Sequence, residues 1–138
     1  MADLVGAPMI LRQIERLRRA KGLDQIVVAT STHASDDVLA QRLNDEGIGV
    51  FRGPLDDVLA RFVGAMDVFG SHETVVRLTA DCPLADPDLI DQTLDLHQTS
   101  GADYTSNTPE RRSYPKGLDA EVVRADVLRQ AAAEATDP

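Results

Sequence analysis

Residues Val75 to Asp86, VVRLTADCPLAD, place a short apolar run directly before a carboxylate, a proline and a second carboxylate. The run has the β-branched, apolar character of a strand buried in a parallel sheet. Asp81 follows that strand, and Pro83 prevents the strand from continuing. Open parallel sheets bind ligands in the crevice outside the carboxyl ends of their strands. We therefore predict a functional site at Asp81.

Helix and strand patterns alternate on both sides of this stretch. Before it we predict, in order, a helix from Pro8 to the residues before Gly22, a strand at 26–30, a helix at 35–47 capped by Ser35, a strand at 48–51 and a helix at 56–70. After it we predict a helix from Pro87, strands at 103–106 and 119–123, and an Ala-rich helix at 125–135. Such alternation with short connections predicts an α/β fold with a doubly wound, mostly parallel sheet, in a single domain over residues 1–138.

The first predicted element is a helix, whereas a doubly wound domain normally begins with a strand and a phosphate-binding, glycine-rich turn. Gly6 is the only glycine before this helix, so the sequence has no glycine-rich turn there. We therefore expect an incomplete sheet with an exposed apolar edge, which favours a homodimer. Opposite its apolar stripe the helix carries six charged side chains, which we interpret as solvated: Arg12, Glu15, Arg16, Arg18, Arg19 and Lys21.

The composition limits the classes of partner. The chain has 138 residues, 43% of them apolar, which suits a domain with a substantial core. Its net charge of -9 argues against nucleic-acid polymers and anionic membrane surfaces, which need clustered Lys and Arg. No apolar run approaches the ~20 residues of a membrane span, and the single Cys82 fits a reducing compartment. We therefore expect a cytoplasmic protein, in which an anionic substrate would need a divalent cation or local Arg and Lys.

Four acidic residues are candidates for chemistry. Asp81 can bind Mg²⁺, which proteins hold through one or two carboxylates together with substrate phosphates. Asp86 can do the same, or it can cap the helix that follows it. Asp119 and Glu121 share one face if their segment is a strand, and they then present two carboxylates either to a ligand or to solvent. Gly117, just before them, permits a close approach of the backbone.

The His and Cys residues form no recognisable site. The three histidines lack the spacing of metal ligands: His33, His72 and His97. Cys82 lies beside the predicted site, but no base for a nucleophilic thiol is evident, and we interpret the residue as packing. The sequence contains no Ser nucleophile elbow, Walker loop or complete dinucleotide fingerprint.

Four segments in a fixed order cover nearly the whole chain and carry a family resemblance. They are LVGAPMILRQIERLRRAKGLDQIVVATS at 4–31, GVFRGPLDDVLARF at 49–62, VVRLTADCPLADPDLID at 75–91 and ADYTSNTPERRSYPKGLDAEVV at 102–123. Together they resemble the acylneuraminate-type cytidylyltransferases, which make CMP-activated acidic sugars, and within them the SpsF-like branch of spore-coat polysaccharide biosynthesis.

The resemblance implies a Rossmann-like fold of the nucleotide-diphospho-sugar transferase type. It implies an enzyme that uses Mg²⁺, couples CTP to an acidic or related sugar and releases pyrophosphate. Asp81 matches the metal-binding acid of the family, and Arg77 and Thr79 lie where the family contacts the nucleotide. The sugar side of the site would involve four residues: Asn107, Gly117, Asp119 and Glu121. Such phosphoryl chemistry asks the protein mainly for positioning and charge neutralisation.

Two parts of the family pattern are missing from this sequence: an upstream loop of glycine and arginine that wraps the triphosphate, and a late second metal-binding acid. We therefore expect a domain that is incomplete at both ends and has little activity alone. A non-catalytic Rossmann-like binding or assembly module is one alternative. A nucleotide-sugar glycosyltransferase is another, although its usual Asp-x-Asp pair is absent at Asp81, where the sequence reads Asp-Cys-Pro.

Overall fold

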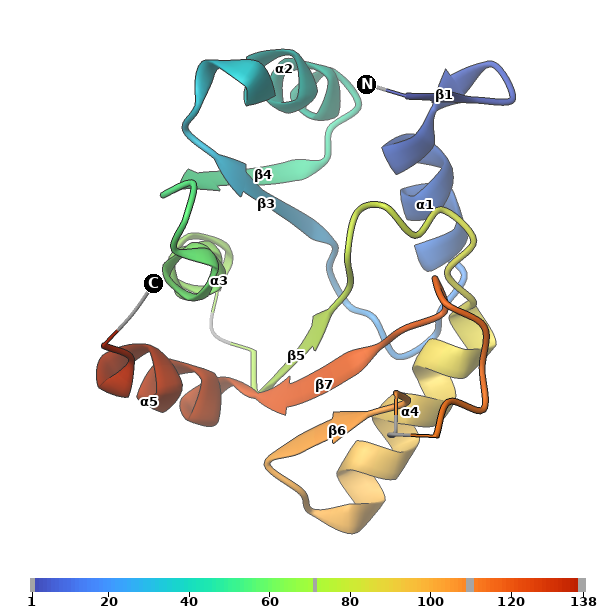
Figure 1. The fold of residues 1–138 in the computed structure, drawn as a ribbon, viewed down its shortest axis with the longest axis vertical. Coiled ribbons are helices and arrows are strands. Elements are labelled where there is room, and N and C mark those ends of the chain that lie inside the picture. Colours follow the sequence, from blue (N-terminus) through green and yellow to red (C-terminus); the bar gives the residue numbers. More distant parts are fainter. Residues whose placement is uncertain (1, 71, 109–110, 137–138) are drawn as a thin grey trace. The chain divides into compact units, whose positions relative to one another are not determined.

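The computed structural model describes residues 2–70, 72–108 and 111–136, which form two compact units (Figure 1). The first unit comprises Met1–Gln25 and Thr74–Arg124, and the second comprises Ile26–Glu73 and Ala125–Pro138. Each unit is therefore built from two separate segments of the chain. Each unit combines helices with paired strands, which confirms the predicted α/β class. That residues 1–138 form one domain stays a prediction.

A three-stranded antiparallel sheet forms the centre of the first unit. Its strands, in spatial order, are β5 (Thr74–Arg77), β7 (Glu121–Arg124) and β6 (Tyr104–Ser106). β7 lies between the other two strands, is antiparallel to both, and contributes the fully buried Val122. Because Arg77 pairs with Glu121, the last residue of β5 lies opposite the first residue of β7. This register fixes the point at which β5 leaves the sheet.

Helix α4 (Pro87–Ser100) packs against β6 and β7 of this sheet (Figure 1). Its buried side contains Leu89, Ile90 and Leu94. The buried His97 of α4 is hydrogen-bonded through Nδ1 to the Thr105 hydroxyl of β6 at 3.0 Å. This histidine is therefore a hydrogen-bonded part of the helix–sheet contact.

Helix α1 (Met9–Leu17) begins directly after Pro8, as predicted, but it ends several residues before Gly22. Asp91 of α4 accepts hydrogen bonds from the backbone N–H of Lys21 at 3.0 Å and of Gly22 at 2.9 Å. A Cβ on Gly22 would lie 2.8 Å from Leu94 Cδ1, so a larger residue would force the Leu94 side chain to shift. These hydrogen bonds hold the segment after α1 against α4. A helix that continued past Leu17 would not permit this contact.

Two arginines of α1 bind backbone carbonyls, which corrects the interpretation of a wholly solvated charged face. Arg16 donates from Nε to the carbonyl of Ala85 at 3.0 Å. Arg12 donates from Nη2 to the carbonyl of Val5 at 2.7 Å and from Nε to that of Leu4 at 3.3 Å. The long guanidinium side chains therefore tie α1 to the segments before and beside it.

A β-hairpin that sequence patterns did not indicate precedes α1. Strand β1 (Asp3–Leu4) pairs antiparallel with β2 (Ala7–Pro8) through a two-residue loop, Val5 and Gly6, with φ of 53° and 76°. Positive φ at both loop residues favours Asn-Gly in such hairpins. A β-branched side chain is strained there, and Val5 is 84% exposed, so packing does little to offset the strain.

We expect Val5→Asn to stabilise the protein by about 1 kcal/mol, because Asn tolerates the left-handed backbone that strains Val. Thermal unfolding measures this as a rise in Tm of about 3 °C. Val5→Ala is the matched control, since it removes the branch but supplies no side chain suited to positive φ. An unchanged or lower Tm for Val5→Asn would contradict the inferred strain.

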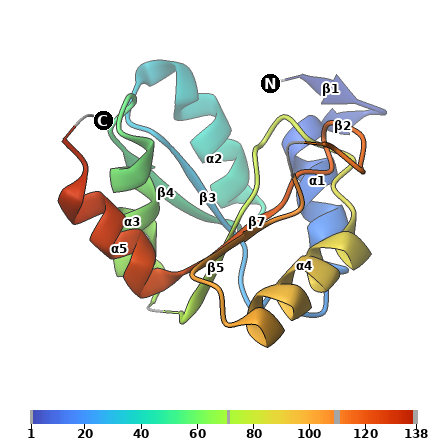
Figure 2. The ribbon, with the colours of Figure 1, turned by 60° about the horizontal axis from the view of Figure 1, so that its bottom comes forward.

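Two parallel strands, β3 (Val27–Ser31) and β4 (Gly49–Gly53), form the sheet of the second unit, with Val27 opposite Gly49. The α-helices of this unit are α2 (Asp37–Asp45), α3 (Val58–Phe69) and α5 (Ala125–Glu134). Helix α3 lies close against β4, because a Cβ on Gly64 would be 2.3 Å from the Phe51 ring. Helices α3 and α5 lie side by side (Figure 2) and are joined by an ion pair of 2.6 Å between Arg129 and Asp67.

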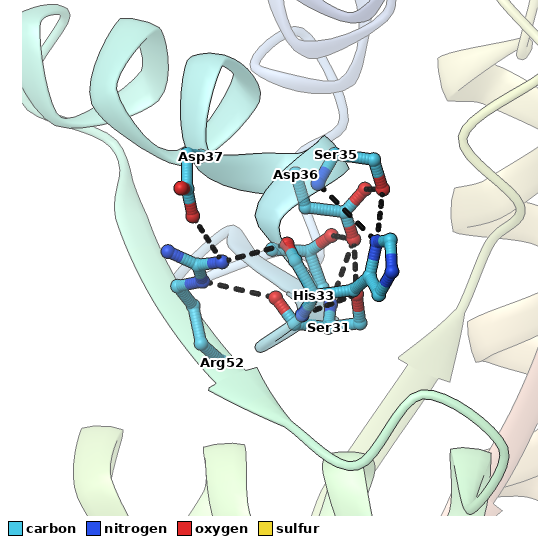
Figure 3. Close-up of polar contacts among 7 residues, drawn as sticks. Ser31, His33, Ser35, Asp36, Asp37 and Arg52 are labelled. Atoms are coloured by element: carbon cyan, nitrogen blue, oxygen red, sulfur yellow. Dashed lines mark hydrogen bonds and ion pairs between the residues drawn. The ribbon is translucent and has the colours of Figure 1, made fainter.

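A network of polar groups closes the loop between β3 and α2 (Figure 3). Asp36 Oδ2 accepts hydrogen bonds from the Thr30 hydroxyl at 2.7 Å, the Ser31 hydroxyl at 2.6 Å and the Ser31 N–H at 3.0 Å. The Ser31 and then the Thr30 hydroxyl hold the pKa of Asp36 far below its ordinary value. Arg52 of β4 donates to the carbonyl of Ser31 at 2.9 Å and pairs with Asp37 at 2.7 Å. We call these five residues the Asp36 cluster.

The start of α2 differs from the prediction that Ser35 caps it. Residues Ala34–Asp36 instead form a short 3-10 turn, η1, and α2 begins at Asp37. The His33 ring accepts the Ser35 N–H at 3.3 Å, so the histidine caps the turn. The Ser35 hydroxyl is hydrogen-bonded to that ring at 2.9 Å and donates to Asp36 at 3.2 Å.

Within the described ranges, no helix is long and apolar enough to cross a membrane.

Candidate active site

The candidate site is a turn between β5 and α4 in the first unit, residues 78–85. The turn is held by two internal hydrogen bonds, from the Cys82 N–H to the Thr79 carbonyl at 3.4 Å and from the Ala85 N–H to the Cys82 carbonyl at 3.1 Å. Asp81 lies on this turn with its side chain exposed. β5 ends at Arg77, so Asp81 lies on the turn four residues beyond the carboxyl end of the strand, and its carboxylate is accessible to a ligand.

The carboxylate of Asp81 is ionised at neutral pH. Hydrogen bonds from the Thr79 side chain, and then from Cys82, hold the pKa of Asp81 below its ordinary value. The Cys82 thiol donates to Asp81 Oδ1 at 3.5 Å and is itself hydrogen-bonded to the Thr79 hydroxyl at 3.2 Å. These three side chains form one small polar group, which presents a negatively charged oxygen pair to solvent.

Asp86 caps α4. Its Oδ1 accepts hydrogen bonds from the N–H groups of Asp88 at 3.0 Å and Leu89 at 3.2 Å, and Pro87 occupies the first helical position. This is the usual arrangement of an aspartate N-cap. Of the two roles that the sequence allows for Asp86, the structure therefore supports capping.

Arg77 and Glu121 are brought together by the sheet register. They lie opposite each other on β5 and β7 and form an ion pair of 2.6 Å. The family resemblance implies a nucleotide contact for Arg77 and a sugar contact for Glu121. In the structure each of these side chains already has the other as a partner of opposite charge. Arg77 uses one of its five N–H donors in this contact, and its side chain is 41% exposed.

The segment predicted to face the sugar lies beside the turn. The Asn107 amide clamps it: Nδ2 donates to the carbonyl of Leu118 at 2.7 Å, and Oδ1 accepts the Ala120 N–H at 2.9 Å. Gly117 has a φ of 93°, and a Cβ built on it would lie 4.0 Å from the Cys82 sulfur. The backbone at Gly117 therefore comes close to the turn that carries Asp81.

Asp119 and Glu121 are engaged by different arginines. Asp119 forms an ion pair with Arg112, whereas Glu121 pairs with Arg77. Strand β7 begins at Glu121, so Asp119 lies outside the strand. The predicted pair of adjacent strand carboxylates is therefore not formed, because the regular alternation of the strand starts two residues later than expected.

Sequence reasoning missed Gln13 as a neighbour of the site. Gln13 is 2% exposed on the inner side of α1, and its Nε2 donates to the Thr79 carbonyl at 2.8 Å. The available signal was a polar residue beside Ile14 and near Leu17 on the apolar face of a helix. A buried amide in that position requires a partner, and the partner belongs to the turn.

The groups at the turn, the Asp81 carboxylate and the Thr79 hydroxyl, fit a metal ion that takes only part of its ligands from the protein. Within residues 2–70, 72–108 and 111–136, no group of three or more His, Cys, Asp or Glu side chains could hold a metal. Asp81 is an exposed, ionised carboxylate with the Thr79 hydroxyl beside it. One carboxylate suits Mg²⁺, which retains waters and binds substrate phosphates, and does not suit ions that need several protein ligands.

The model of the family described as "Cytidylyltransferase" matches residues 1–131. The chain belongs to this family. The Bacillus subtilis (strain 168) spore coat polysaccharide biosynthesis protein SpsF is 35% identical over 119 residues, which cover 83% of this chain and 48% of SpsF. A 3-deoxy-manno-octulosonate cytidylyltransferase of Anaeromyxobacter sp. (strain K) is 36% identical over 93 residues, 66% of this chain and 37% of that protein.

Among solved structures, a cytidylyltransferase from Leptospira borgpetersenii superposes with a TM-score of 0.87 at 25% identity, covering 96% of this chain and 56% of that one. This similarity confirms the Rossmann-like nucleotidyltransferase fold. The chain spans about half the length of two of the curated relatives that it matches. The family is thus established for the region that contains the turn, whereas the activity of the whole protein remains to be proposed.

Proposed function

We propose that this cytidylyltransferase is a CTP-dependent sugar nucleotidyltransferase in which Asp81 holds Mg²⁺ beside the nucleotide. The observation that carries the proposal is the exposed, ionised Asp81 carboxylate on a turn at the end of β5. Strand ends of this kind are where α/β nucleotide enzymes bind their ligands. When bound, Mg²⁺ would offset the charge of the triphosphate, which a chain with a net charge of -9 would otherwise repel.

The reaction would join a sugar hydroxyl oxygen to the α-phosphorus of CTP while the bond from that phosphorus to the pyrophosphate oxygen breaks. The protein would contribute mainly position and charge. Thr79 offers a hydroxyl beside the nucleotide. Arg77 retains N–H donors for a phosphate while Glu121 holds its guanidinium in place. Both contributions depend on the geometry at the end of β5.

We place the sugar beside the turn, at residues 107–108 and 117–121. There Asn107 fixes the backbone at 118–120, and Gly117 leaves room for a ligand because it has no side chain. The names of the relatives favour an acidic sugar and a role in surface or spore-coat polysaccharide biosynthesis.

A cytoplasmic location and a homodimer stay predictions. Cys82 is the single cysteine, and its half-buried thiol agrees with a reducing compartment.

Calorimetric titration of the chain with CTP, with and without Mg²⁺, tests this function. We expect binding that requires Mg²⁺ and prefers CTP over UTP and GTP. Release of pyrophosphate in the presence of 3-deoxy-manno-octulosonate measures turnover, which we expect to be low for a chain that spans about half of its relatives. Absence of Mg²⁺-dependent CTP binding would contradict the proposal and would favour a non-catalytic binding or assembly module.

A further inference from the structure

Gln13 carries a buried polar atom that its surroundings do not satisfy. Its Nε2 donates to the Thr79 carbonyl at 2.8 Å, but its Oε1 is buried and has no hydrogen-bond partner among the described residues. Leaving such an oxygen unpaired costs about 1–3 kcal/mol. An apolar side chain of similar volume, such as Met, would fill the same space without that cost. Stability alone therefore does not account for a glutamine at this position.

Gln13 binds the carbonyl of Thr79, the second residue of the turn 78–85 that carries Asp81. Three residues further along α1, Arg16 donates to the carbonyl of Ala85 at 3.0 Å. Residues three apart lie on the same side of a helix. Side chains of α1 thus bind the turn near both of its ends, at Thr79 and at Ala85.

Asp81 itself is fixed only by its neighbours within the turn. Its exposed carboxylate accepts a hydrogen bond from the Cys82 thiol at 3.5 Å, and the Thr79 hydroxyl is hydrogen-bonded to that thiol at 3.2 Å. The position of the Asp81 carboxylate therefore follows the position of the turn, which α1 sets. A shift of about 1 Å at such a group is enough to reduce the binding or turnover of a correctly oriented ligand.

We infer that Gln13 is a positioning residue, which sets the place of Thr79 and Asp81 for a metal-bound nucleotide without touching the ligand. The inference rests on the function proposed above. It predicts an unusual combination for Gln13→Met: a Tm close to that of the wild type, because removal of the unpaired Oε1 offsets the loss of the hydrogen bond to the Thr79 carbonyl, together with a looser turn and weaker metal–nucleotide binding. A residue with a purely structural role would change stability without a specific effect on binding.

Two measurements on the full chain test this inference. The first is the rate at which the single Cys82 reacts with the thiol reagent DTNB, which reports opening of the turn without any ligand. We expect Gln13→Met to raise that rate several-fold. The second is a titration of Mn²⁺ in the presence of CTP, followed by the electron paramagnetic resonance signal of free Mn²⁺. We expect about a 3- to 10-fold weaker affinity.

Thr93→Val is the matched control, because Thr93 is also buried and polar, but its hydroxyl donates to the Leu89 carbonyl of its own helix. It should leave both measurements unchanged. An unchanged DTNB rate for Gln13→Met overturns the inference whatever the nucleotide result. A raised rate with wild-type Mn²⁺ affinity also overturns it, provided that Asp81→Asn weakens binding. If Asp81→Asn binds Mn²⁺ and CTP as the wild type does, the proposed metal site fails, and the positioning role fails with it.

Discussion

Replacing Asp36 by Ala is expected to lower the free energy of unfolding by about 2–4 kcal/mol. Asp36 accepts three hydrogen bonds on one oxygen from Thr30 and Ser31, and Ser31 is 1% exposed. Without the carboxylate, buried donors lose their partner and the loop into α2 loses its anchor. Urea unfolding, followed by circular dichroism, measures the loss.

The effect should depend on pH. The pKa of Asp36 is lower in the folded protein than its ordinary value of 3.8. The ionised carboxylate therefore contributes its full stabilisation at any pH well above 3.8. As the pH falls below about 4, this contribution is lost progressively. The stability difference between the wild type and Asp36→Asn should therefore be largest near neutral pH and should shrink on acidification.

Asp37→Ala is the matched control for Asp36→Ala. Asp37 is the next residue and carries the same charge, but its side chain is 61% exposed and pairs with Arg52 at the surface. Exposed ion pairs contribute at most about 1 kcal/mol, so Asp37→Ala should cost much less. Equal losses for the two variants would show that net charge, rather than the hydrogen bonds of the Asp36 cluster, determines the effect.

Elements with strong local signals were predictable. Pro8 marks the start of α1, Pro87 follows the cap of α4, and the apolar run from residue 26 becomes β3. Elements with a weak local signal, or with partners far away in the sequence, were not. The β1–β2 hairpin has two-residue strands and a Val-Gly loop in place of the usual Asn-Gly, so its local signal is weak. The antiparallel direction of β7 is likewise set by its pairing with β5, which lies far away in the sequence.

The candidate site shows the same division. The position of Asp81 on the turn after β5 followed from an apolar run that precedes a carboxylate, which is a local pattern. The partners of Arg77 and Asp119 did not follow, because ion pairs between distant segments leave no periodic trace in a single sequence. Gln13 was equally hidden: the pattern shows that α1 buries this side, but it does not show that the amide reaches the Thr79 carbonyl.

Replacing Asp81 by Asn is expected to reduce the apparent affinity for Mn²⁺ in the presence of CTP by about 100-fold, and turnover by at least as much. The substitution keeps the size of the side chain but removes its charge, and no group of three or more His, Cys, Asp or Glu side chains among the described residues offers the metal an alternative site. Because its pKa lies below the ordinary value, the wild-type carboxylate needs no deprotonation at neutral pH. Metal binding should therefore weaken only in acid, and Asp81→Asn should not show that pH dependence.

Asp88→Asn separates a specific metal contact from a general effect of charge. Asp88 is an exposed acid in the first turn of α4 and lies near Asp81 in the sequence, so its replacement changes the net charge by the same amount. Loss of one exposed charge weakens the attraction of a cation only slightly at physiological ionic strength. We therefore expect Asp88→Asn to bind Mn²⁺ and CTP within about 2-fold of the wild type. Similar losses for both variants would indicate that the overall negative field attracts the metal, and Asp81 would then not be its ligand.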